Sequence, residues 1–272
     1  MIPFAKTIAM LFVIAFLVTG CQQAGRDTVD TLAAGPDFGT MPLPPDYLSQ
    51  AIVATGRMQQ WTKTTKLDLD GVLALYQPDG STYLTQWRWE IYPWSNSVRI
   101  SGIEPDGEFT WELSQGQFRI LAGTDVAASS FGRISQSDLS EVVLTIITAP
   151  IRCLNASDRL TRAPEPIKVQ GLWYYAIKQT LGGQTGSQNN KRLDMELRQP
   201  YWTAVVFYQN RDNSLIDVVG FSDAGKGKFL LARGYDYMRL QKKAMLLPAR
   251  IEIFKTDVRG AMPQRLAQVS FN

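Results

Sequence analysis

The chain has 272 residues, of which 45% are hydrophobic, 11% aromatic and 19% charged, a composition that argues against disordered, collagen-like and polytopic membrane proteins. The formal charge of +3 is too small to indicate nucleic acid as a partner. The absence of histidine excludes Ser-His-Asp and Cys-His catalysis and every His-ligated metal site. Two cysteines cannot form a thiolate zinc or iron–sulfur site within one chain, so we expect no metal and no other cofactor.

Residues 1–20 have the pattern of a secretory signal peptide. Lys6 precedes an apolar run from Ile8 to Val18, which is shorter than the roughly 20 residues that span a bilayer. The run ends in Leu17-Val18-Thr19-Gly20-Cys21, which resembles the lipobox of bacterial lipoproteins. The resemblance implies cleavage before Cys21 and lipidation of its sulfur. An ordinary signal peptide with Cys21 as a bystander, or an uncleaved anchor, is the alternative.

Residues 21–45 are interpreted as a tether between Cys21 and a folded domain. They are rich in Gly, Asp, Thr, Ala and Pro and have no apolar periodicity. Acyl chains on Cys21 would hold the protein stably at a membrane. The residue after Cys21 is Gln22. In enteric lipoproteins an Asp at this position retains the protein in the inner membrane. By the same resemblance, Gln22 therefore implies a location at the outer membrane, facing the periplasm.

Residues 46–272 are predicted to form a single domain, because no repeat or linker follows residue 45. A short helix is expected to begin near Pro45 or Asp46 and to end at Gly56. Clean alternation of apolar and polar residues then predicts antiparallel strands with turns every eight to twelve residues. These strands are expected over residues 67–76, 83–91, 97–103, 108–114 and 117–121.

A helix interrupts the strands in the middle of the chain. Ser137 is a suitable N-cap for a helix over residues 138–149, and Pro150 is expected to end it. A long strand over 167–181 and a polar loop over 182–191 follow. Further strands are expected over 202–209, 214–222, 228–233, 235–239, 247–253 and 266–271. The total is about ten to twelve strands with a few helices, a mainly β (α+β) fold.

Large aromatic residues fall on the predicted strands and supply an apolar sheet face. A wide antiparallel sheet curls, and such a face either lines a cavity for an apolar ligand or packs into a closed core. The two possibilities stay open at this level. The candidate ligand-lining residues are Tyr83, Trp87, Trp89, Phe109, Trp111, Trp173, Tyr175 and Phe207.

Few residues suggest catalysis. The segment Gly220–Gly227 matches GxxxxGK, but Gly227 stands where a phosphate loop needs Ser or Thr, so a hairpin turn is expected. The carboxylate sets Asp68 with Asp70, and Glu104 with Asp106 and Glu108, are the candidates for a glycosidase. Solvent exposure explains them more simply, so we expect no catalytic residue.

Two further features of the sequence concern a thiol and a charge imbalance. Cys153 lies in an apolar stretch and is predicted to be a buried structural thiol. Residues 191–272 hold 14 basic and 8 acidic residues. This basic portion could bind anionic lipid headgroups. A solvated surface is the more common reason for such an uneven distribution of charge along a chain.

Both ends of the domain resemble the LolA/LolB-like lipoprotein carrier proteins. At the beginning, residues 51–61 lead into the first long strand; in those carriers a helix that ends in glycine, here Gly56, is followed by a tryptophan, here Trp61, and then by that strand. At the end, Leu247-Pro-Ala-Arg-Ile-Glu-Ile253 precedes a terminal strand that closes with Val269-Ser-Phe-Asn272. The resemblance implies a strongly curved, unclosed antiparallel β-barrel with helices over its concave face, which holds lipid or acylated protein. The chain is longer than the carriers, and the protruding apolar loop residue of LolB has no counterpart that can be placed.

The sequence therefore favours a lipid-anchored protein of the bacterial envelope that is not an enzyme and binds an apolar ligand, a lipid or an acylated protein. A non-catalytic interaction module is the first alternative. A carboxylate-based hydrolase is the second.

Overall fold

The computed structural model describes residues 44–123, 133–169, 171–181, 202–223, 228–240, 244–256 and 263–272. The expected signal peptide, most of the expected tether, the polar loop over 182–191 and residues 224–227 of the expected hairpin turn lie outside these residues.

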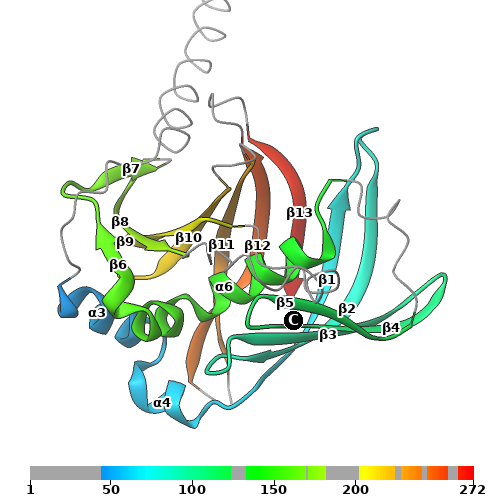
Figure 1. Ribbon diagram of the computed structural model, residues 1–272, viewed down its shortest axis with the longest axis horizontal. Coiled ribbons are helices and arrows are strands. Elements are labelled where there is room, and N and C mark those ends of the chain that lie inside the picture. The colour runs from blue at the N-terminus through cyan, green and yellow to red at the C-terminus, as the bar shows by residue number, and fades with distance from the viewer. Residues whose placement is uncertain are drawn as a thin grey trace, which may run out of the picture.

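The described residues form one antiparallel sheet of thirteen strands (Figure 1). The first five strands are β1 Leu67–Tyr76, β2 Thr82–Tyr92, β3 Ser97–Glu104, β4 Gly107–Ser114 and β5 Gln117–Ala122. The others are β6 Leu160–Arg162, β7 Ile167–Val169, β8 Leu172–Thr180, β9 Ala204–Asn210, β10 Ile216–Asp223, β11 Lys228–Leu240, β12 Met245–Thr256 and β13 Gln264–Phe271.

The sheet joins its two halves through the first and last strands. Its order is β5-β4-β3-β2-β1-β13-β12-β11-β10-β9-β8-β6, and β7 also pairs with β8. Gly71 of β1 lies opposite Phe271 of β13. The two ends of this order, β5 and β6, do not pair with each other, so the curved sheet stays open. The predicted unclosed β half-barrel is therefore confirmed, with one strand more than expected.

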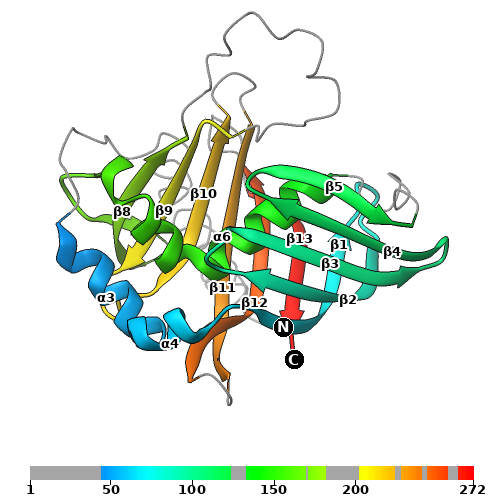
Figure 2. The same cartoon turned by 60° about the horizontal axis from the view of Figure 1, so that its bottom comes forward.

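Three α-helices accompany the sheet within the described residues. They are α3 Pro45–Thr55, α4 Arg57–Lys63 and α6 Gln136–Asn155, and a short 3₁₀ turn follows at Ser157–Arg159. Figure 2 shows α6 crossing the hollow side of the curved sheet, with α3 and α4 at one end. None of these helices combines the length and the apolar character that a bilayer crossing requires.

The predicted middle helix was placed correctly but bounded wrongly. Its N-cap is Ser135, not Ser137, and the Ser135 side chain accepts a hydrogen bond from the backbone N–H of Asp138 at 3.0 Å. Pro150 does not end the helix, which continues to Asn155. A proline costs the helix one backbone hydrogen bond. Here the residues on both sides of Pro150 are fully buried, and this burial outweighs that loss.

The predicted long strand over 167–181 was also wrong. The chain forms β7, turns at Gly171 with φ 87°, and returns as β8, while β6 adds a third short strand. Only glycine adopts this φ without strain, so Gly171 fixes the turn. The apolar run Leu172–Ile177 follows Gln170-Gly171 directly, and no proline or longer polar segment marks the turn in the sequence.

Candidate functional site

The concave face of β2–β4 carries a tightly packed aromatic cluster. The Trp87 ring centroid lies 5.1 Å from that of Trp111 and 5.2 Å from that of Phe109, in edge-to-face arrangements. Phe109 and Trp111 lie 4.4 Å apart, and Trp89 meets Phe271 of the last strand at 6.2 Å. All five side chains are buried. Phe207 is also buried, on β9 in the other half of the same core.

Helix α6 covers this aromatic face. It contacts β3 and β4 on one side, β10, β11 and β12 on the other, and α3 at its flank. Its residues from Asp138 to Ile151 are all buried. The candidate residues Trp87, Trp89, Phe109, Trp111 and Phe207 therefore belong to a core that is filled by a helix.

Helix α6 contains a largely buried ion pair between Glu141 and Arg152. Arg152 Nη1 donates to Glu141 Oε1 and to Thr145 Oγ1, each at 2.6 Å. Thr145 Oγ1 in turn lies 3.3 Å from Glu141 Oε1. A buried ion pair is costly to break by removing one partner. Because both partners belong to α6, the pair does not tie the helix to the sheet.

Cys153 confirms the prediction of a buried thiol. It lies on α6 and is fully buried. Burial raises the pKa of this thiol far above its ordinary value, so the sulfur is protonated and inert in this arrangement.

The remaining candidates lie at the margins of the core. Tyr175 is half-buried and packs edge-to-face on Tyr47 of α3, with ring centroids 4.7 Å apart. Trp173 is on the same face of β8 but is 47% exposed, and Lys168 Nζ lies 6.0 Å from the centroid of its ring. Trp173 is therefore not part of the buried aromatic set, because it lies near the strand end, beyond the helices.

A carboxylate closes the end of the aromatic face. Glu104 is buried and accepts hydrogen bonds from the Tyr83 hydroxyl, from Thr85 Oγ1 at 2.8 Å and from Trp87 Nε1 at 2.8 Å. Burial, and then the bond to Glu104, raise the pKa of Tyr83 to about 12. Tyr83 and Trp87 thus serve as donors to Glu104 as well as apolar surface, a role that alternation alone did not indicate.

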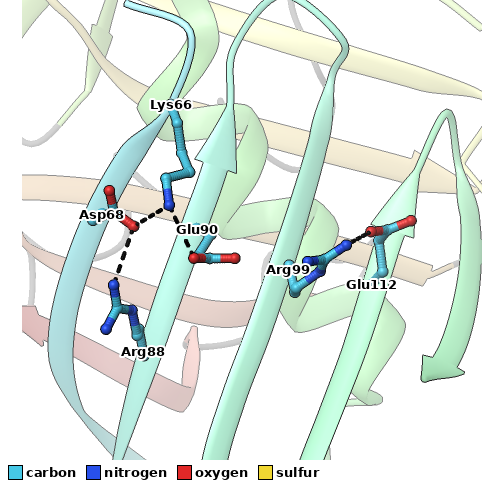
Figure 3. A network of polar contacts seen from close by, with 6 residues as sticks. All are labelled: Lys66, Asp68, Arg88, Glu90, Arg99 and Glu112. Carbon is cyan, nitrogen blue, oxygen red and sulfur yellow. Dashed lines mark hydrogen bonds and ion pairs between the residues drawn. The ribbon is translucent and has the colours of Figure 1, made fainter. Parts of the chain in front are cut away.

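Asp68, another carboxylate considered for catalysis, lies on the opposite, outer face of the sheet (Figure 3). Lys66 Nζ bridges Asp68 at 2.8 Å and Glu90 at 3.0 Å, and Arg88 lies 3.4 Å from Asp68. The Lys66 hydrogen bond is the main reason that the pKa of Asp68 is lowered. Asp68 is thus engaged in ion pairs outside the sheet, while Glu104 faces inside. Asp70 and Glu108, one from each candidate set, both line a hollow on the outer face.

Two hollows lie outside the concave face. The larger, of about 610 Å³, is on the outer face of β1–β4 and is lined mainly by polar residues, among them Asp70, Gln86, Arg88 and Glu108. The smaller, of about 420 Å³, lies where α3 and α4 meet the end of the β11–β12 pair. No group of three or more acidic, cysteine or histidine side chains suited to a metal ion occurs within the described part of the chain.

A buried polar cluster on the outer face was missed by the sequence analysis. Asp217 is buried beside Tyr174, whose hydroxyl donates to Asp217 Oδ2 at 3.4 Å. Burial raises the pKa of Asp217 to about 6, against a smaller opposing effect of Arg233. A register shift in β10 between Ile216 and Val218 puts Asp217 on the outer side with Val218. No sequence signal marked this shift.

No protein-family model matches the chain, and no curated protein is similar to it in sequence. Among solved structures, the chain is similar to a LolA superfamily protein from Nitrosomonas europaea, with 11% identity, coverage of 84% of this chain and 90% of that one, and a TM-score of 0.47. A DUF1329 family protein from Desulfovibrio piger matches with 10% identity, coverage of 86% and 92%, and a TM-score of 0.44. An outer membrane lipoprotein-sorting protein domain from Vibrio parahaemolyticus matches with 11% identity, coverage of 79% and 87%, and a TM-score of 0.40.

Two of these names agree with the resemblance noted in the sequence. At such low identities and scores they add nothing to the strand order described above, so function has to be inferred from this chain's own residues.

Proposed function

We propose that the protein is a lipid-anchored component of the bacterial envelope, attached through Cys21 at the outer membrane and facing the periplasm, and that its half-barrel binds an apolar ligand. The ligand class is a lipid or the acyl chains of an acylated protein. The observation that carries the proposal is the aromatic concave face, against which α6 packs.

The ligand would take the place of α6 against the aromatic face. Three considerations support this view. The buried ion pair of α6, Glu141 with Arg152, is internal and would move with the helix. The aromatic rings of Trp87, Trp89 and Trp111 would present a large apolar surface once the helix is displaced. Burial of acyl chains, at about 0.8 kcal/mol per CH₂, would compensate for the contacts that α6 loses.

Cys153 provides the test, because it is the only cysteine beyond residue 21 and its thiol is buried on α6. A chain beginning at residue 22 is incubated with a fluorescent fatty acid or a short-chain phospholipid, and its reaction with a maleimide is followed. We expect stoichiometric uptake together with faster labelling of Cys153. Native mass spectrometry with organic extraction identifies any lipid that the chain retains from the cell. A chain that is empty, takes up no lipid and keeps Cys153 unreactive would overturn the proposal.

Two matched substitutions locate the ligand. Trp111→Leu removes a ring from the concave face, and Trp173→Leu removes a half-exposed ring at the rim of the same sheet. We expect uptake to weaken in the first variant and to stay unchanged in the second, with thermal melting checking that both are folded. Equal uptake by both variants would place the ligand elsewhere.

A non-catalytic interaction module is the second candidate. The observation that favours it is the filled concave face, together with exposed apolar residues Ile120 and Leu121 on β5 at the end of the sheet. An edge strand with such residues is suited to contact with another protein. Crosslinking in intact cells that captures one defined partner at β5, with no lipid bound, would favour this candidate.

A further inference from the structure

A second feature of the molecule, the smaller hollow, combines positive charge with apolar surface. It lies between the α3–α4 junction and the end of the β11–β12 pair, and its volume is about 420 Å³. Arg57 and Arg239 line it from these two elements, with Gln59, Gln60, Val53 and Leu246. We call this set of residues the arginine hollow. Figure 2 shows α4 beside the lower end of β11 and β12, where the hollow is formed.

The backbone holds the two walls of the arginine hollow close together. Gly56 ends α3 with φ 137°, and Arg57 follows with φ 67°, so the chain turns sharply into α4. A Cβ at Gly56 would lie 3.2 Å from the Met245 Cα and 3.3 Å from the Ala244 carbonyl oxygen. The helix junction therefore touches the strand end directly at a glycine. The positions of both arginine-bearing elements are consequently fixed relative to each other.

The charge in the arginine hollow is not compensated within the described structure. Neither Arg57 nor Arg239 forms an ion pair with any residue that the structure describes, and no described acidic residue lines the hollow. Other exposed arginines do form ion pairs, as Arg99 does with Glu112 at 3.1 Å. Two guanidinium groups at one hollow are suited to a phosphate, because each guanidinium offers a planar fork of N–H donors to the phosphate oxygens. The amides of Gln59 and Gln60 add further donors.

Apolar side chains beside these cations favour a lipid over a soluble anion. Val53 is 60% exposed and lines the hollow, and Met58 on the first turn of α4 is 40% exposed. Cationic and apolar groups together are typical of surfaces that lie at a membrane interface. The hollow also lies at the helix pair that directly follows the expected tether from Cys21, and a tether of that length reaches about 27 Å.

We propose that the arginine hollow binds the phosphate of an anionic phospholipid headgroup and so orients the domain on the membrane surface. The inference rests on the envelope location in the proposed function. It does not depend on a ligand in the concave face. Two cations near an anionic surface correspond to a five- to thirtyfold gain in affinity, to order of magnitude.

The test uses the chain from residue 22, which keeps every described element but lacks the acyl anchor. Its binding to vesicles of phosphatidylcholine alone, and with about one third phosphatidylglycerol, is measured by co-sedimentation at low and moderate salt. The variant is Arg57→Gln with Arg239→Gln. Its control is Arg119→Gln with Arg159→Gln, which removes the same charge from exposed sites on β5 and on the turn before β6. Thermal melting verifies that both variants are folded.

We expect salt-sensitive binding to the anionic vesicles, at least fivefold weaker in the variant and close to wild type in the control. Equal loss in both double variants would overturn the proposal, because net charge alone would then explain binding. Absence of vesicle binding would overturn it too, as would full competition by millimolar inorganic phosphate, which would indicate a general anion site. Fatty-acid uptake is measured on the same samples, so failure of the apolar-ligand proposal is seen separately.

Discussion

Gly102 offers the sharpest test of whether the aromatic face is as closely packed as the structure indicates. It lies on β3 directly opposite Trp87 of β2 and Phe109 of β4. A Cβ added at Gly102 would lie 2.6 Å from Trp87 Cδ1 and 2.8 Å from Phe109 Cε1. Both distances are well inside van der Waals contact, and both rings are buried, so neither can move without disturbing its neighbours.

The magnitude for Gly102→Ala follows from two opposing effects. Overpacking a rigid core costs about 1–3 kcal/mol. Replacing a strand glycine by alanine raises the free energy of unfolding by about 0.5–1 kcal/mol, mainly because it restricts the unfolded chain. The net expectation is a loss of about 1–2 kcal/mol in the free energy of unfolding, which lowers the melting temperature by about 2–8 °C in a domain of this size.

Gly220→Ala is the matched control. Gly220 also lies within a strand without a left-handed φ, but the nearest atom to its added Cβ is Tyr208 Cε2 at 3.6 Å, an ordinary contact. We expect its stability to be unchanged or slightly increased. Urea unfolding and thermal melting of both variants provide the comparison. If Gly102→Ala is as stable as Gly220→Ala, the aromatic face yields easily and the close packing inferred here is incorrect.

Three further predictions concern charge and capping. Asp217 has a pKa of about 6 in the folded chain and 3.8 in the unfolded reference, so the folded state retains the proton to higher pH. The free energy of unfolding should therefore fall by up to about 3 kcal/mol as the pH rises from 4 to 6. Asp217→Asn should remove that dependence in urea titrations across this range. Arg152→Met leaves Glu141 buried without its partner and should lower the free energy of unfolding by about 3–5 kcal/mol in chemical denaturation. The double variant with Glu141→Leu should recover most of this loss. An equally unstable double variant would contradict the prediction. Ser135→Ala removes the N-cap of α6 and should cost about 1 kcal/mol by thermal melting, and no change would show that the bond to Asp138 is not stabilising.

The positions of β1 to β4 could be predicted because each of these strands has one largely buried face. In β2, Trp87, Trp89 and Ile91 are buried and alternate with residues that are exposed or only partly buried, as expected from period-2 alternation. The boundaries of α6 were less accurate. Burial of both sides of Pro150 depends on β strands far away in the sequence, and no local pattern reports it.

The sequence by itself determined the class of fold, the apolar face of strands such as β2 and the burial of Cys153, because these depend on local periodicity and on the hydrophobic effect. Only the tertiary structure decided that α6 fills the concave face, that Glu104 is held by Tyr83, Thr85 and Trp87, and that Arg57 and Arg239 share one hollow. Arg57 and Arg239 are more than 180 residues apart in the chain. Their proximity follows from the order of strands in the sheet, which brings the β11–β12 pair beside the first helices. The order in which strands pair is a property of the whole chain, so no local sequence pattern reports it.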